Sequence, residues 1–223
     1  MSDISKLEPK LLWKYFYEIT QIPRPSKKEQ RMIDYMKKFG EDKGLETIVD
    51  KTGNVIIRKP ATKGMENRKG IILQGHLDMV PQKNSDKVFD FETDPIEAYA
   101  DGGWVKANGT TLGADNGIGV AAAMAALTDP EVEHGPLEAL FTIDEETGMT
   151  GANNLAKGVL QGEIMINMDS EDEGELYVGC AGGIDVSAKR NYGLDRTPEG
   201  TAAYKIVIKG LRGGHSGVDI PLD

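Results

Sequence analysis

Residues 70–81 read GIILQGHLDMVP, and this stretch organises the rest of the chain. The apolar run Ile71–Gln74 predicts a short strand that is buried on both faces. Beyond Gly75, His76 and Asp78 are two positions apart, so their side chains leave an extended chain on the same side. Ligands and catalytic groups collect at such strand ends in open parallel sheets. The alternative is a strand that leaves the core through a polar turn.

Composition places the chain among soluble globular proteins. Its 223 residues suffice for one full domain and part of another, with 39% hydrophobic and 28% charged residues. The net charge of −10 argues against nucleic acid or an anionic membrane as the main partner. No apolar run is long enough to span a membrane, and the N-terminal sequence lacks the apolar core of a signal peptide. Cys180 is the single cysteine, so an internal disulfide is excluded. We therefore expect a cytoplasmic protein.

Two more apolar runs end in acidic residues. Leu137–Ile143 precedes Asp144, Glu145 and Glu146, and Ile164–Met168 precedes Asp169. Consecutive carboxylates at a strand exit repel one another unless a cation or solvent separates them. These runs therefore predict two further strands with acidic carboxyl ends, of which the first, at 137–143, is buried.

Helical segments are expected between the strands, at about 117–128 and 151–160. Glycines flank Asp115 in GADNG, which places this carboxylate at the start of the first segment. Asp115 is either a site residue or an ordinary N-cap. The alternation of strands and helices favours an α/β fold with a largely parallel sheet.

The flanking regions complete the predicted fold. Helical spacing predicts a helix over 7–20, and Ser26 with Glu29 predicts a capping box for a second helix that ends near Gly44. The IPRPS turn between them is interpreted as structural, with a place near the site as the alternative. Alternating patterns predict a hairpin from 45–50 and 54–59, and half-exposed antiparallel strands at 184–191 and 203–209.

The polar strand ends form one candidate constellation, made of His76, Asp78, Asp115, Glu145, Glu146 and Asp169. An imidazole with several carboxylates suits zinc or a similar divalent ion, whereas an all-oxygen set would favour magnesium or calcium. One carboxylate can bridge two ions, so a two-metal hydrolytic centre is a reasonable hypothesis.

Five motifs in order carry a family resemblance: GHLDMV, GADNGIG, DEETGMTGA, NMDSED and GGHSG. Together they resemble the M20 metallopeptidases, and within them the aminoacyl-histidine dipeptidases, also called Xaa-His or cytosol non-specific dipeptidases. The resemblance implies a zinc-peptidase-like, three-layer αβα catalytic domain with a mostly parallel sheet over 1–182. It also implies the start of an α+β lid or dimerisation domain over 183–223.

The resemblance further implies a role for each candidate residue. His76 and Asp169 would bind one zinc ion, Glu146 would bind a second, and Asp115 would bridge them. Asp78 would orient His76, and Glu145 would be the general base. His215, in GGHSG, would hydrogen-bond the substrate carbonyl. The implied activity is hydrolysis of dipeptides, Xaa-His or broader, with cobalt or manganese as other possible metals and a homodimer formed through the lid.

The chain also departs from the family pattern. Family members are longer and return from the lid to the catalytic domain with another metal-binding histidine, and none of the 3 histidines here matches that ligand. His134 precedes a strand and is expected to make local hydrogen bonds. We therefore expect an incomplete, weakly active or inactive fragment. The alternatives are a non-catalytic metal-binding or assembly module, and a deacylase of N-acyl amino acids.

Overall fold

The computed structural model describes residues 4–170, 172, 174–179, 186–208 and 210. Contacts divide the chain into two units, Met1–Tyr177 and Val178–Asp223. Within the described residues, every helix is too short or too polar to cross a membrane. The predicted domain boundary at 182/183 lies outside the described residues.

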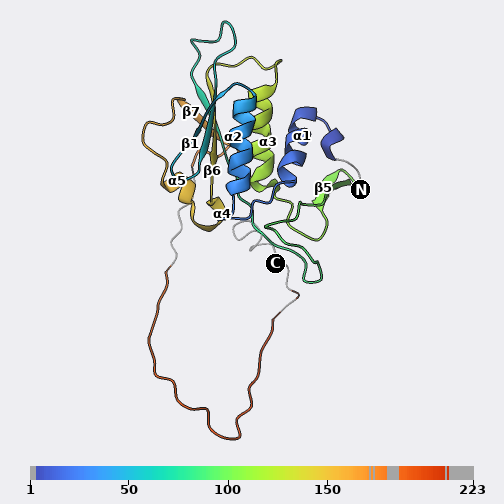
Figure 1. Ribbon diagram of the computed structural model, residues 1–223, viewed down its shortest axis with the longest axis vertical. Coiled ribbons are helices and arrows are strands. Elements are labelled where there is room, and N and C mark those ends of the chain that lie inside the picture. The colour runs from blue at the N-terminus through green and yellow to red at the C-terminus, as the bar shows by residue number, and fades with distance from the viewer. Residues whose placement is uncertain (1–3, 171, 173, 180–185, 209, 211–223) are drawn as a thin grey trace. The chain divides into compact units, whose positions relative to one another are not determined.

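The first unit contains all the described helices and strands (Figure 1). The helices are η1 (Ile4–Lys6), α1 (Lys10–Thr20), α2 (Gln30–Asp42), α3 (Ala114–Thr128), α4 (Glu145–Gly148) and α5 (Thr150–Asn153). The strands are β1 (Glu46–Val49), β2 (Val55–Lys59), β3 (Ile71–His76), β4 (Ala98–Asp101), β5 (Trp104–Ala107), β6 (Leu137–Thr142) and β7 (Ile164–Asn167). The predicted helices over 7–20 and 117–128 and the predicted hairpin are confirmed.

The central sheet has the strand order β1-β2-β6-β3-β7. Strand β3 pairs in parallel with both β6 and β7, whereas β2 is antiparallel to β1 and to β6. Four strands therefore run in one direction and β2 opposes them. This is the predicted α/β fold with a mostly parallel sheet, and its parallel half carries the strands that end in polar residues.

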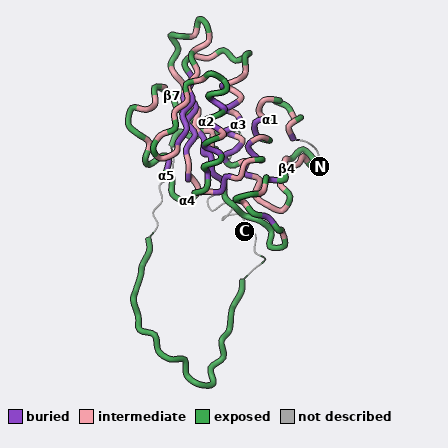
Figure 2. Tube along the Cα trace, viewed as in Figure 1, coloured by how far each residue is buried: buried purple, intermediate pink, exposed green. Residues whose placement is uncertain are grey.

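Three helices cover one face of this sheet. Helices α2 and α3 pack on the strands, and α1 packs on α3 (Figure 1). Strand β6 lies in the middle and is buried along its whole length, with Ala139 and Phe141 facing the helices. Alternate residues of β2 divide between the faces: Val55 and Ile57 join the helical core, and Ile56 joins the opposite cluster. Figure 2 shows the buried residues gathered along these elements.

The opposite face is covered by the connection from α5 to β7. Leu155, Val159 and Leu160 pack there on Ile56 and Ile72. The predicted helix over 151–160 is wrong beyond Asn153, because α5 ends there and Gly158 has a left-handed backbone (φ +75°). Helix α5 and this connection therefore form the third layer of the expected αβα arrangement.

The described part of the second unit differs from the prediction. Residues 186–208 contain neither helix nor strand, and every one of them is exposed. The strands predicted at 184–191 and 203–209 are therefore absent from 186–191 and 203–208. An alternating pattern stabilises a sheet only when its apolar side is covered, and here Ile206 and Ile208 are exposed.

Candidate metal centre

The three parallel strands bring their polar ends to one edge of the sheet. His76, the last residue of β3, lies opposite Thr142 at the end of β6. Asn167 ends β7 opposite Gln74 of β3. The acidic residues that follow β6 and β7 therefore emerge beside His76, as the sequence predicted.

His76 is the centre of the carboxylate cluster. The side chain is 1% exposed, and Nε2 lies 3.0 Å from Oδ1 of Asp115 and 3.5 Å from Oδ1 of Asp169. On the other side of the ring, Nδ1 lies 3.3 Å from Oδ1 of Asp78. Burial lowers the pKa of His76, but the three carboxylates outweigh it and raise the pKa to about 12. A cation is therefore strongly favoured at this position.

Asp78 joins His76 to the loop after β6. Its fully buried carboxylate accepts hydrogen bonds from the backbone N–H groups of Glu145 (3.0 Å) and Glu146 (3.2 Å), and from Oγ of Ser26 (2.8 Å). Burial opposes ionisation, yet His76 and these donors lower the pKa of Asp78 to about 2. Asp78 therefore favours the ionised form, with its carboxylate 3.3 Å from Nδ1 of His76.

Asp115 lies at a kink in the first turn of α3. Asp115 and Asn116 have non-helical backbone angles, and Gly113 before them is left-handed (φ +69°). The residue before the helix is Gly113, and the extended backbone of Asp115 interrupts the first turn. Next to this kink, the Asp115 carboxylate lies 3.0 Å from Nε2 of His76. His76, Asp115 and Glu146 each offer a ligand atom within 4.8 Å of the others.

Glu145 and Glu146 start the short helix α4 directly after Asp144. Asp144 has a left-handed backbone (φ +50°), and its carboxylate accepts hydrogen bonds from the hydroxyls of Thr147 and Thr150. Burial raises the pKa of Glu145 and, together with the charge of Asp115, raises that of Glu146 to about 7. A carboxylate with a raised pKa is a suitable proton acceptor near neutral pH.

Asn116 contacts Asp169, the last acidic residue of the constellation. Its Nδ2 atom donates hydrogen bonds of 2.7 Å to Oδ1 of Asp169 and to the backbone oxygen of Met168. Asn116 was not among the candidate residues of the sequence analysis. Its position next to Asp115 was the available signal, because a residue beside a candidate ligand reaches the same edge of the sheet.

The turn at residues 22–26 contributes to the site, although its sequence was interpreted as structural. Ser26 donates to Asp78, and the buried Glu29 accepts the backbone N–H of Asp144 at 3.1 Å. The predicted capping box is wrong, since α2 has Glu29 as its N-cap residue and lacks a side-chain cap hydrogen bond. Buried Arg24 was missed as well, because local sequence patterns carry no signal for contacts between segments about 50 residues apart.

Of the other two histidines, only His134 lies in the described part of the chain, and it is not part of the cluster. It makes the expected local contacts: Nδ1 lies 2.6 Å from the backbone oxygen of Gly135, and its backbone N–H donates to Oγ1 of Thr62. His215 and Cys180 lie outside the described residues.

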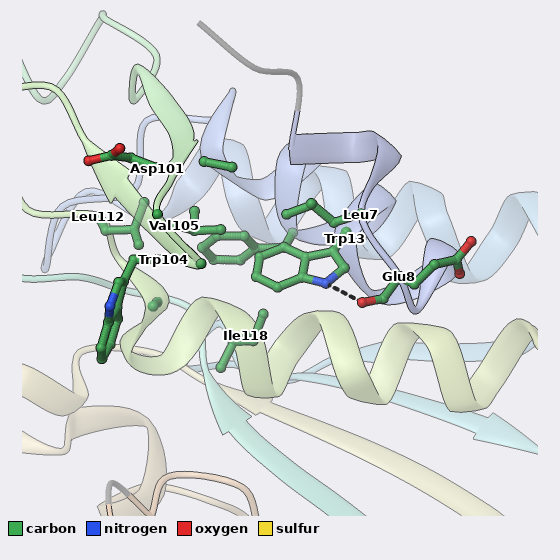
Figure 3. A pocket seen from close by; sticks show the side chains of 13 residues that line it. Leu7, Glu8, Trp13, Asp101, Trp104, Val105, Leu112 and Ile118 are labelled. Carbon is green, nitrogen blue, oxygen red and sulfur yellow. Dashed lines mark hydrogen bonds between the residues drawn. The ribbon is translucent and has the colours of Figure 1, made fainter.

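A separate pocket of about 600 Å³ lies beside the first turns of α3 (Figure 3). Its lining is largely apolar and includes Trp13, Trp104, Leu112 and Ile118. The indole N–H of Trp13 donates to the backbone oxygen of Glu8 at 3.0 Å. None of the six clustered polar side chains lines this pocket, so the candidate chemistry belongs to the cluster.

The donor set of the cluster fits a divalent metal. One imidazole and several carboxylates converge, and a soft-to-borderline ion such as zinc prefers this mixture over the all-oxygen sets of calcium and magnesium. The Asp78 carboxylate lies on the far side of the His76 ring, where ligating histidines commonly have a carboxylate partner. A second group of three buried carboxylates, Glu29, Asp78 and Asp144, lies behind it but contains no imidazole.

Comparisons with known proteins agree with this geometry. The model of the peptidase family M20/M25/M40 matches residues 72–211. The cytosol non-specific dipeptidase of Escherichia coli K12 is 54% identical over 99% of this chain and 45% of its own length. Aminoacylhistidine dipeptidase from Vibrio alginolyticus is similar in structure, with a TM-score of 0.79, 56% identity and coverage of 80% of this chain and 36% of its own.

A more distant structure shares the fold. Aminopeptidase PepT from Bacillus cereus gives a TM-score of 0.61 at 26% identity, covering 73% of this chain and 44% of its own. The chain thus spans less than half the length of these relatives.

Proposed function

The chain belongs to the peptidase family M20/M25/M40, and on that basis we propose that it carries the metal centre of a dipeptidase. The observation that carries the proposal is the convergence of His76, Asp115 and Glu146 within 4.8 Å of one another. The names of the Escherichia coli and Vibrio alginolyticus relatives support a dipeptide, Xaa-His or broader, as the substrate.

Zinc is the proposed metal, with two ions in a complete site. His76 and Asp169 would bind one ion and Glu146 the other, with Asp115 between them. The 3.0 Å approach of Asp115 to His76 supports the bridging role, and the 3.5 Å approach of Asp169 to the same nitrogen supports a shared ion. A divalent ion bound there would supply Lewis acidity to the scissile carbonyl and lower the pKa of a water molecule.

The remaining steps fall to side chains of this chain. Glu145 would take a proton from the attacking water and pass it to the leaving amine, a role that suits its raised pKa. Asp78 would keep His76 in one orientation and tautomer. His215 would donate a hydrogen bond to the carbonyl oxygen as it gains negative charge.

Partners and location follow the same resemblance. The name of the Escherichia coli relative supports a cytoplasmic location. Residues 183–223 would start a lid domain through which two copies associate, and the mass of the protein in sedimentation experiments would test this.

A second candidate is a non-catalytic module that binds a single ion. The observation that favours it is that His76 is the only imidazole among the described ligands, since His134 bonds elsewhere. Deacylation of N-acyl amino acids would use the same residues and differ only in the substrate.

One experiment separates these functions. The wild-type chain and the Glu145→Gln variant are each supplied with zinc, cobalt or manganese. Both are then assayed for hydrolysis of Ala-His, Ala-Ala and an N-acetyl amino acid. We expect dipeptide cleavage that the Glu145→Gln variant loses while it keeps its metal. Metal binding without any cleavage would support the single-ion module, and cleavage of only the N-acetyl compound would support the deacylase.

A further inference from the structure

The turn formed by Arg24, Pro25 and Ser26 lies alongside the segment that follows β3. The backbone N–H of Met79 donates to the oxygen of Arg24 at 3.2 Å, and the N–H of Ser26 donates to the oxygen of Met79 at 3.3 Å. Pro25 and Met79 form a parallel bridge. The turn is therefore attached directly to the residues that carry His76 and Asp78.

The Arg24 side chain connects this segment to the start of α3. The residue is only 2% exposed, and Nη1 donates hydrogen bonds to the backbone oxygens of Leu77 (2.9 Å) and Asp78 (2.7 Å). Nη2 of the same guanidinium donates to the backbone oxygen of Gly113. One rigid, planar group thus bonds the chain just after His76 and just before Asp115.

The glycines on either side of Asp115 leave room for this group. A Cβ atom on Gly113 would lie 2.6 Å from Nη2 of Arg24, and one on Gly117 would lie 2.7 Å from it. Gly113 also needs its left-handed backbone, but the backbone of Gly117 is not left-handed. The absence of a side chain at Gly117 is therefore explained by the space that Arg24 and the ring of Phe16 occupy.

Charge alone does not account for an arginine here. Burial lowers the pKa of Arg24 to about 10, so it remains protonated at neutral pH beside Asp78, Asp115 and Glu146. These three carboxylates attract the cation, but a lysine would supply the same charge. Only the planar guanidinium makes the hydrogen bonds to the backbone oxygens of Leu77, Asp78 and Gly113.

From these contacts we propose that Arg24 is a positioning residue of the metal centre. By bonding Leu77, Asp78 and Gly113 at once, it sets the separation between His76 and Asp115 that a shared ion requires. This inference rests on the proposed function and adds to it the element that joins the two ligand-bearing segments.

The test measures zinc affinity of the whole 223-residue chain by competition with a chromophoric chelator. Arg24→Lys keeps the positive charge but cannot bond three carbonyl oxygens in the same plane, and Arg24→Met removes the charge. We expect both variants to lose about 10- to 100-fold in affinity, the usual effect of disturbing the support of a metal ligand. Wild-type affinity in Arg24→Lys would overturn the proposal, as would tighter binding in Arg24→Met.

Two further variants keep the test decisive if the Arg24 variants do not fold. Gly117→Ala adds one methyl group against the guanidinium and should also weaken zinc binding; unchanged affinity would overturn the proposal. Leu127→Ala, in the last turn of the same helix, removes buried core volume instead. It should lower the unfolding temperature and leave zinc affinity unchanged, and weaker zinc binding here would show that general destabilisation explains the Arg24 effect.

Failure of the proposed function gives a different result. In that case the wild-type chain and His76→Ala would bind zinc equally poorly, and both proposals would fall. A wild-type chain that binds zinc through His76, with normal binding in all Arg24 and Gly117 variants, would overturn only the role of Arg24.

Discussion

Asp78 accepts the backbone N–H of Glu145 at 3.0 Å, so the residue that we propose to orient His76 also contacts the backbone of the proposed general base. The two residues come from different strand ends, β3 and β6, which are neighbours in the sheet. A single buried carboxylate therefore couples the ligand side of the site to the proton-transfer side.

Asp78→Asn tests this coupling. The side-chain NH₂ group of Asn is itself a hydrogen-bond donor, and it would face one of the N–H or O–H groups that now donate to the Asp78 carboxylate. We therefore expect zinc affinity to fall by about 10- to 100-fold. Chelator competition measures the change. Ser26→Ala is the matched control, because it removes one hydrogen bond to Asp78 and keeps the charge; it should cost about 1 kcal/mol in unfolding free energy. Equal zinc affinities in Asp78→Asn and wild type would contradict the coupling.

Glu146 should make the stability of the metal-free chain depend on pH. Its pKa is raised from 4.5 to about 7 in the folded chain, so the folded state holds the proton more tightly than the unfolded state between these values. The free energy of unfolding should therefore decrease as pH rises from about 4.5 to 7. Urea denaturation at several pH values in the presence of a chelator measures this slope. Glu146→Gln should flatten it, and an unchanged slope in that variant would show that other groups cause it.

Asn116→Ala should weaken the site through Asp169. The variant loses two 2.7 Å hydrogen bonds, to the backbone oxygen of Met168 and to the Asp169 carboxylate. We expect a loss of about 1–3 kcal/mol in unfolding free energy together with weaker zinc binding. Urea titration and chelator competition measure the two effects. Asn153→Ala, an exposed position in α5, is the control and should keep wild-type zinc affinity.

Phe141→Ala tests the core beneath the site. Phe141 is fully buried on the central strand β6, so its truncation leaves a cavity and should cost about 3–5 kcal/mol. Val88 is 96% exposed, and Val88→Ala should change the unfolding free energy by less than about 0.5 kcal/mol. Denaturant unfolding monitored by circular dichroism compares them. A small loss in Phe141→Ala would mean that β6 is not the centre of the folded core.

Much of the fold could be predicted because its signals are local. The apolar run before His76, the alternating hairpin pattern and the helical spacing of α1 each depend on neighbours within a few residues. The rule that parallel strands end at one edge then predicted that His76, Glu146 and Asp169 lie together, whereas Asp115 reaches the same site from the first turn of α3. Prediction failed for the helix over 151–160, which ends at Asn153 before the left-handed Gly158. It also failed for the strands predicted at 184–191 and 203–209, whose described residues have no covered apolar face.

By itself, the sequence determined which residues are candidates for the chemistry, because the residue types that follow its apolar runs are read directly from it. Only the tertiary structure decided what holds them in place. Arg24, Ser26 and Asn116 act on partners about 50 residues away, and nothing in their local sequence identifies those partners. Such contacts depend on which buried donor meets which carbonyl or carboxylate once the sheet has formed, and a buried polar group must find that partner or destabilise the fold.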